Sequence, residues 1–314
     1  MIHIKKLVNT KQISHSEWLE LRKKGIGGSD AAAIVGLNNY VTPYKLWADK
    51  TDRLPEVEDN EAMRQGRDFE DYVAKRFEEA TGKKVRRQNS MIVHDKYNFI
   101  LANIDRQVVG ENAGLECKTT SVMNLKKFKN GEFPDNYYVQ CVHYMAVTGA
   151  DKWYLAVLVL NQGFYWFEIK RDEEEISTLI NSEIDFWNNH IIPDIAPEVD
   201  GYKPTSETID KVFKNAIDDE CKLVGLSNIE NLLELQKTIK TLELEAEKLQ
   251  QQIKIELGQC KIGYCNNYEV TWKEQSRSTI SKELIKEQYP DVDISKVSKS
   301  STFRVFKINN KEDK

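Results

Sequence analysis

Apolar residues in the first 200 positions follow two periods, one typical of helices and the other of strands. The helical period predicts helices over residues 29–35, 61–80, 137–148 and 173–191. Runs rich in aromatic and aliphatic residues predict strands over residues 98–109, 115–119, 153–160 and 164–170. Strands in the middle of the segment with helices on either side predict an α/β or α+β core with a central mixed sheet.

The pattern changes after residue 200, where prolines and glycines punctuate an acidic stretch. We therefore expect one domain over 1–200 and a C-terminal extension over 201–314. Residues 228–257 predict a long helix with a heptad seam, formed by Leu232, Leu235, Ile239, Leu242, Ala246, Leu249 and Ile253. This seam could pack within its own chain or against a second copy. Beyond the helix we expect strands over 261–273 and 302–308 and a short helix over 281–289.

Ionisable residues gather where residues 101–120 predict a pair of antiparallel strands. If residues 110–113 form the turn, Asp105 lies opposite Lys118. Glu116 shares their face, because side chains alternate along a strand, and Cys117 points away. Two carboxylates and one ammonium group then converge. Taken alone, they favour a cross-strand salt bridge, which is a common feature of strand pairs.

Two of the predicted helices add a polar residue to an otherwise apolar face. In the helix over 61–80 this residue is Glu70, and in the helix over 137–148 it is Gln140. A buried amide such as that of Gln140 needs hydrogen-bond partners. Glu70 could be a third carboxylate for the same site, a residue at the edge of the apolar face, or a partner for Arg67.

Composition excludes several classes of protein. With 314 residues, 40% hydrophobic and 30% charged, the chain is long enough for about two globular domains. Its five cysteines and five histidines are scattered, without the spacing of disulfide scaffolds, zinc sites or iron-sulfur clusters.

Oxygen ligands alone suit a hard cation such as Mg²⁺ or Mn²⁺. Such ions serve phosphoryl chemistry, in which Lys118 could orient or deprotonate the attacking water.

Six segments occur in order across residues 18–176. They are W-L-E-L-R-K-K-G-I-G-G-S-D from Trp18, G-R-D-F-E from Gly66, N-I-D from Asn103, G-L-E-C-K from Gly114, Y-Y-V-Q-C-V-H-Y-M from Tyr137 and R-D-E-E-E-I from Arg171. Together they resemble the YqaJ-like viral recombinases related to phage lambda exonuclease, within the PD-(D/E)xK nuclease superfamily. The chain departs from the superfamily pattern at Ile104, where the family name has proline.

The resemblance implies a restriction-endonuclease-like core that acts as a magnesium-dependent 5′→3′ exonuclease on double-stranded DNA, with Mn²⁺ able to substitute. The metal ligands that it implies are Glu70, Asp105, Glu116 and the carbonyl of Cys117. It also implies that Lys118 is the catalytic lysine and that Gln140 helps to hold the site.

The Gly-rich segment before the first predicted helix carries a second implied site. Gly25, Gly27 and Gly28 would let the backbone approach a ligand closely, and Ser29 could cap the helix. Exposed amides at a helix start, with Arg22 nearby, suit a terminal phosphate. The resemblance implies that this phosphate is the 5′-phosphate of the digested strand. The alternative is an ordinary Gly-rich helix entry.

The resemblance further implies a single-strand annealing protein as partner and a homo-oligomer that forms a trimeric ring around DNA. Two other functions remain open, a structure-specific endonuclease with the same site and a non-catalytic DNA-binding scaffold. We expect a cytoplasmic chain that makes no contact with membranes, because it has no long apolar run and no signal-peptide core. The net charge of −5 hides basic segments at residues 1–30 and 118–130 and an acidic segment at 168–185.

Overall fold

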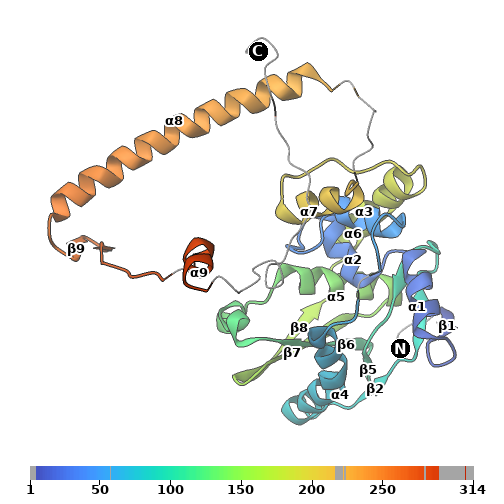
Figure 1. Cartoon of the computed structure of the whole chain (residues 1–314). Coiled ribbons are helices and arrows are strands. Elements are labelled where there is room, and N and C mark those ends of the chain that lie inside the picture. The colour runs from blue at the N-terminus through green and yellow to red at the C-terminus, as the bar shows by residue number, and fades with distance from the viewer. Residues whose placement is uncertain are drawn as a thin grey trace. The chain divides into compact units, whose positions relative to one another are not determined.

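The computed structural model describes residues 5–56, 58–215, 222, 224–278, 281–289 and 308 (Figure 1). The chain divides into two compact units, Met1–Lys214 and Asn215–Lys314. Apart from residue 308, the strand predicted over 302–308 lies outside the described residues. None of the helices in the described part of the chain is both long and apolar enough to cross a membrane.

A mixed five-stranded sheet is the centre of the first unit. Its strands, in spatial order, are β2 (Val85–Arg87), β5 (Arg106–Val108), β6 (Ala113–Thr120), β7 (Lys152–Val159) and β8 (Gly163–Lys170). β6 and β7 run parallel, and the other neighbours are antiparallel. Helix α5 (Asp135–Thr148) connects the parallel pair, as a parallel crossover requires. The predicted α/β class with a central mixed sheet is therefore confirmed.

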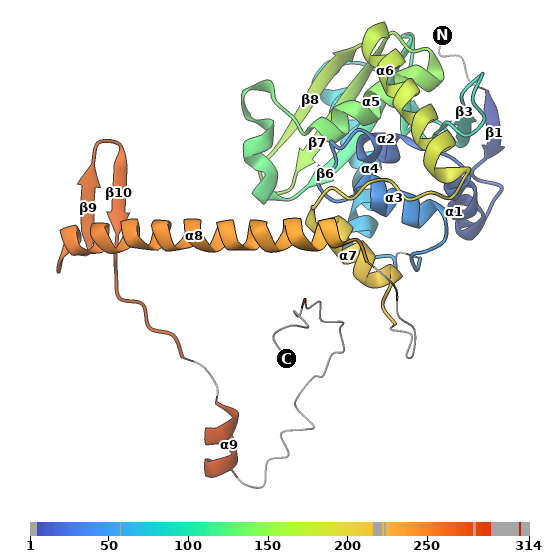
Figure 2. The ribbon, with the colours of Figure 1, turned by 90° about the horizontal axis from the view of Figure 1, so that it is seen from above.

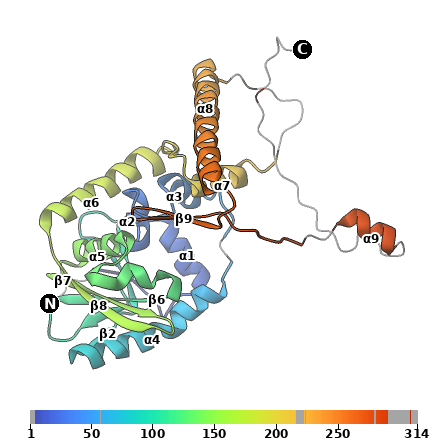
Figure 3. The ribbon, with the colours of Figure 1, turned by 90° about the vertical axis from the view of Figure 1, so that its left-hand side faces the viewer.

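Helices cover both faces of this sheet (Figure 3). On one face, α4 (Glu61–Thr81) buries Val73 and Phe77 against Tyr154 of β7. On the other face, α5 packs on Trp153 in the main core cluster. β7 is an almost uninterrupted apolar run because both of its faces are covered.

The remaining elements of the first unit surround this core. They are β1 (Lys6–Asn9), α1 (His15–Lys23), α2 (Gly28–Ile34), α3 (Pro43–Lys50), β3 (Ser90–Val93), β4 (Leu101–Ala102), the 3₁₀ turn η1 (Val122–Gly131), α6 (Glu173–Phe186), the π-helical turn η2 (Trp187–Ile191) and α7 (Lys203–Val212). β1, β3 and β4 form a separate three-stranded sheet. α7 follows the proline-punctuated stretch but packs on α3, where the hydroxyls of Thr42 and Thr205 are 2.7 Å apart.

The strand expected over 98–109 is interrupted, because residues 103–105 connect β4 and β5, which belong to different sheets. The register of the hairpin also differs from the expected one. Arg106 pairs with Leu115 and Gln107 with Gly114, so the expected register, with Asp105 opposite Lys118, was wrong by two residues. A shift of two residues keeps every side chain on its expected face, since the strand period is two.

The second unit consists of α8 (Leu226–Leu257), the hairpin of β9 (Ile262–Cys265) and β10 (Tyr268–Thr271), and α9 (Lys282–Gln288) (Figure 2). The predicted long helix, hairpin and short helix are thus confirmed. Gly258 ends α8, with a positive φ of 55°. No residue of α8 is buried in the structure as described, so the heptad seam lies open in this unit.

Candidate active site

β6 carries two of the predicted site residues toward α5. Glu116 is only 3% exposed, and its Oε1 atom lies 2.5 Å from Nζ of Lys118. Asp105 lies just before β5, and its Oδ2 atom accepts a hydrogen bond of 2.8 Å from the backbone N–H of Cys117. The Cys117 side chain packs instead with the cluster beneath α4, as the alternation of the strand predicts. The hairpin therefore brings Asp105, Glu116 and Lys118 together.

α5 supplies Gln140 from the opposite side of the cluster. Its Nε2 atom donates to Oε1 of Glu116 at 2.8 Å and to the hydroxyl oxygen of Tyr144 at 2.7 Å. The spacing that places Gln140 and Tyr144 on one helical face therefore also satisfies the buried amide. Because Gln140 is itself buried, it fixes the orientation of the Glu116 carboxylate.

The buried charges of this cluster shift one another's pKa values. Burial raises the pKa of Asp105 well above its usual range, and repulsion from Glu116 and Glu70 adds to the rise. Burial lowers the pKa of Lys118, but attraction to Glu116 and Asp105 outweighs this effect, so its pKa lies above the ordinary value. Lys118 is therefore a stable ammonium group, suited to orienting a water or a phosphate oxygen rather than to removing a proton.

Negative charge exceeds positive charge in this cluster, and one acceptor has no partner. Oε2 of Glu116 is a buried atom with no hydrogen-bond donor among the described residues. A buried carboxylate oxygen without a partner is costly unless a cation compensates it. Asp105, Glu116 and the carbonyl of Cys117 offer the oxygen ligands that Mg²⁺ and Mn²⁺ prefer. In the part of the chain that the structure describes, no three acidic, His or Cys side chains already stand together as a metal site.

Glu70 reaches the edge of this cluster from α4 but is held by Arg106, which also donates to the carbonyl oxygen of Asp105 at 2.8 Å. It forms a salt bridge with Arg106, whose register partner Leu115 packs under α4. Arg106 is only 3% exposed and also binds Asp71, at 2.6 Å. Sequence reasoning missed Arg106. The available signal was its position directly after Asp105, which places it on the opposite, buried face.

The start of α2 forms the second predicted site, where Nη2 of Arg22 donates to Oγ of Ser29 at 3.0 Å. The guanidinium carbon of Arg22 also lies 4.8 Å from the ring centroid of Trp18. Ser29 does not cap the helix, so that expectation was wrong. Gly27 occupies the N-cap position, and its N–H donates to the carboxylate of Asp30 at 3.0 Å. The Ser29 hydroxyl is therefore available to hold Arg22.

The glycines of this segment serve packing within the chain. A Cβ atom at Gly28 would lie 2.7 Å from a ring carbon of Tyr144 and 3.0 Å from Cγ of Gln140. A Cβ atom at Gly25 would lie 2.5 Å from the carbonyl oxygen of Phe99. The expectation that these two glycines clear space for a ligand was therefore wrong. Gly28 lets α2 pack directly on Tyr144 and on Gln140, which holds Glu116, so the two predicted sites adjoin there.

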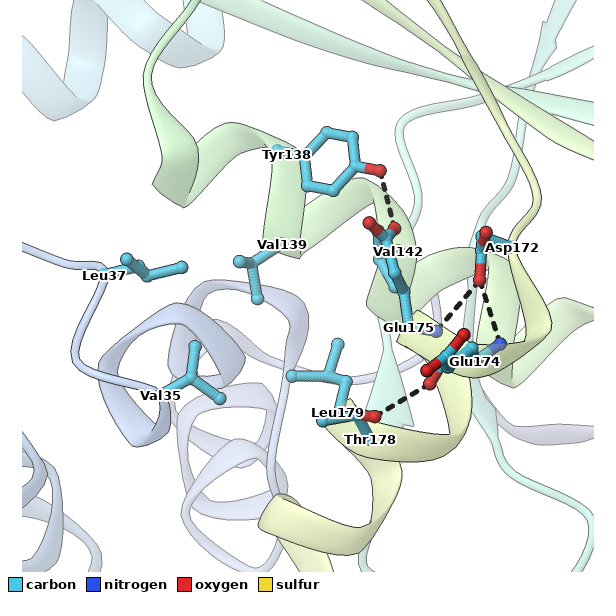
Figure 4. A pocket seen from close by; sticks show the side chains of 10 residues that line it. All are labelled: Val35, Leu37, Tyr138, Val139, Val142, Asp172, Glu174, Glu175, Thr178 and Leu179. Atoms are coloured by element: carbon cyan, nitrogen blue, oxygen red, sulfur yellow. Dashed lines mark hydrogen bonds between the residues drawn. The ribbon is translucent and has the colours of Figure 1, made fainter.

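A separate pocket of about 490 Å³ opens between α2, α5 and α6 (Figure 4). Its lining residues are Val35, Leu37, Tyr138, Val139, Val142, Asp172, Glu174, Glu175, Thr178 and Leu179. The hydroxyl of Tyr138 donates to Glu175 at 2.6 Å. None of the predicted site residues lines this pocket, and its acidic rim is unfavourable for nucleic-acid phosphates.

Comparison with known proteins gives matches over the domain that holds these residues. Residues 17–151 match the YqaJ-like viral recombinase domain. The chain is 42% identical to the protein YqaJ of Bacillus subtilis strain 168 over 308 residues. The aligned region covers 96% of this chain and 96% of YqaJ.

Similar solved structures include two exonucleases. An alkaline exonuclease from Laribacter hongkongensis has a TM-score of 0.48 and 19% identity, over 57% of this chain and 94% of its own. A phage-related exonuclease from Haemophilus somnus 129PT has a TM-score of 0.42 and 13% identity, over 55% of this chain and 96% of its own.

Proposed function

Because the chain belongs to the YqaJ-like viral recombinase family, we propose that it is a metal-dependent exonuclease that digests double-stranded DNA in phage-type recombination. The observation that carries this proposal is the buried Oε2 atom of Glu116, which lacks a donor among the described residues. It belongs to a cluster with Asp105 and Lys118, in which oxygen ligands outnumber positive charges. Such a cluster suits a divalent cation.

Asp105, Glu116 and the carbonyl of Cys117 would hold Mg²⁺ or Mn²⁺ in this proposal. Glu70 would join them if it released Arg106, its present partner. A bound divalent cation supplies an activated water and stabilises the charge that develops on the phosphate. Gln140 keeps Glu116 oriented toward that position, because its amide donates to the inner carboxylate oxygen, Oε1.

Lys118 contributes a fixed positive charge beside the reacting phosphate. Its ammonium group can donate hydrogen bonds to a phosphate oxygen or to the attacking water. Its raised pKa keeps this charge at neutral and mildly alkaline pH. The reacting phosphate would therefore lie beside two positive groups, the bound cation and the ammonium group of Lys118.

The polarity of digestion would follow from Arg22 and Ser29. Their side chains are joined at the N-terminus of α2, where backbone N–H groups and a guanidinium favour an anion. Gly28 of the same helix packs against Gln140, so a 5′-phosphate bound there would lie beside the catalytic cluster. We therefore propose 5′→3′ digestion that leaves a 3′ overhang for a single-strand annealing protein.

The test compares three DNA substrates with the full-length chain in Mg²⁺ and in EDTA. We expect rapid digestion of a linear duplex with 5′-phosphates, slower digestion of the dephosphorylated duplex, and no cutting of a covalently closed circle. Arg22→Ala should remove the difference between the two linear substrates. Cutting of the closed circle would support an endonuclease instead, and DNA binding without any cleavage would support a scaffold.

We also propose that α8 joins copies of the chain. Apolar side chains at heptad spacing lie open along this helix, and in a coiled coil a seam of this kind packs against another helix. Leu235→Glu together with Leu242→Glu should lower the mass measured by light scattering, whereas a Glu substitution at Ile255, outside the seam, should not. Equal masses for the seam variant and the unmodified chain would contradict this assignment.

A further inference from the structure

One tyrosine borders Lys118 without belonging to the metal site, and a second stands in a loop near the same end of α5. Tyr137, in the first turn of α5, presents its ring to the ammonium group of Lys118, with Nζ 5.3 Å from the ring centroid. Tyr40 lies in the loop between α2 and α3, and 69% of its surface is exposed. Leu37 of the same loop lines one pocket with Tyr138 and Val139, so this loop lies against the first turns of α5, where Tyr137 stands.

The loop holds Tyr40 in a fixed conformation despite this exposure. Oδ1 of Asn38 accepts hydrogen bonds from the backbone N–H of Tyr40, at 2.9 Å, and from that of Val41, at 3.1 Å. Nζ of Lys45 donates to the carbonyl oxygen of Tyr40 at 2.9 Å. Asn side chains often stabilise such turns. A ring presented from an ordered turn loses little conformational entropy when it binds a ligand.

We propose that Tyr40 and Tyr137 form a stacking site for nucleobases next to the phosphate that is cleaved. This inference rests on the proposed nuclease function. A phosphate at Lys118 carries a base only one sugar away, and Tyr137 is the aromatic side chain that contacts Lys118. An aromatic ring stacks on any base, so the site would hold the strand end without selecting its sequence. Its ligand class is therefore the nucleobase of a terminal or adjacent nucleotide.

The chain provides a matched control. Tyr202 is 66% exposed, close to the value for Tyr40, but it lies at the start of α7. Replacing Tyr202 by Ala removes an exposed tyrosine of the same unit without touching the loop at Tyr40. A general effect of losing a surface aromatic would appear in both variants, whereas an effect on base stacking would appear only at Tyr40.

The first experiment measures stacking directly by binding, in Ca²⁺ to prevent cleavage. The probe is a duplex with 2-aminopurine as the first or second base of a 5′-phosphorylated strand, because stacking quenches the fluorescence of this base. We expect the unmodified chain, Tyr40→Phe and Tyr202→Ala to quench the probe, and Tyr40→Ala to quench it much less. Equal quenching by Tyr40→Ala and the unmodified chain at both positions would overturn the proposal.

The second experiment uses digestion in Mg²⁺. Tyr40→Ala should raise KM for an ordinary 5′-phosphorylated duplex by about fivefold to a hundredfold, the range that loss of one stacked base gives. It should have little effect on a duplex whose first two nucleotides are abasic, since no base is present to stack. An equal loss on both duplexes would overturn the stacking role. Absence of digestion by the unmodified chain would instead refute the proposed nuclease function, and the fluorescence experiment would still test the stacking site.

Discussion

The two faces of the central sheet each place acidic residues beside a basic residue, but the acidic residues are satisfied differently on the two faces. On the α4 face, Arg106 is buried and forms salt bridges with both Glu70 and Asp71. On the α5 face, Lys118 contacts only one oxygen of Glu116, and the other oxygen has no donor among the described residues. One face is neutralised by its own side chains, whereas the other retains excess negative charge.

Residue types alone therefore do not define a metal site. Both faces contain carboxylates near a cation, and the faces differ in how completely the donors satisfy the acceptors. An Arg with a planar fork can bind two carboxylates at once, whereas a Lys is a point charge. The face with Lys leaves an acceptor open for another cation.

Substitution on the α5 face should abolish activity. We expect Glu116→Gln and Lys118→Met each to lower the rate of Mg²⁺-dependent digestion by about a hundredfold or more, because each removes a charge beside the reacting phosphate. Rates on a 5′-phosphorylated duplex provide the measurement. Glu111→Gln is the control, since Glu111 is paired with Lys83 and Lys152 away from the cluster and should retain activity. Full activity of either first variant would refute the site.

Substitution on the α4 face should affect stability instead. Arg106→Met keeps the length of a buried side chain but leaves Glu70 and Asp71 without their shared partner. We expect the free energy of unfolding in urea to fall by about 1–3 kcal/mol. Arg87→Met breaks an exposed pair with Asp71 and should cost about 1 kcal/mol or less. Equal losses for the two variants would show that Arg106 does not neutralise this face.

A smaller, pH-dependent effect is expected where α5 meets α6. His143 is fully buried, with Nδ1 2.7 Å from Glu183 and Nε2 2.8 Å from the carbonyl oxygen of Leu101. Burial lowers the pKa of His143, but attraction to Glu183 and the bond to this carbonyl outweigh it, so the pKa is raised. Because the pKa of His143 is raised in the folded chain, protonation of His143 stabilises the fold. This stabilisation is fully present at pH values below the pKa of His143 in the unfolded chain, about 6.5.

That stability should be lost as pH rises through the folded pKa of His143. We therefore expect the unfolding temperature of the unmodified chain to exceed that of His143→Gln most at pH 6, and the difference to shrink at alkaline pH. Thermal melts at several pH values measure it, with His190→Gln as the control. A difference that grows with pH would contradict the assigned charge.

The sequence predicted the α5 face well because period-two alternation decides which side chains share a face. Asp105, Glu116 and Lys118 stay together although the predicted register was wrong by two residues. Helical spacing in the same way predicted the face of α5 on which Gln140 lies, and Gln140 donates to Glu116 from that face. These patterns are local, so they do not depend on how distant segments pack.

The position of Glu70 could not be predicted, since it depends on which face of the sheet α4 covers. Its partner Arg106 lies on a different element, and no local pattern links the two. The glycines before α2 were misassigned for a similar reason. Gly25 and Gly28 face Phe99 and Tyr144, which are distant in sequence, so their role as close-packing residues depends on tertiary contacts.

A titration with Mn²⁺ in the absence of DNA, measured by calorimetry, tests whether the α5 face holds a catalytic cation. We expect the full-length chain to bind Mn²⁺, and Asp105→Asn and Glu116→Gln to weaken that binding by about tenfold or more. Glu111→Gln should bind as the unmodified chain does. An unmodified chain that binds no Mn²⁺, or variants at Asp105 and Glu116 with unchanged affinity, would show that the α5 face does not hold the cation.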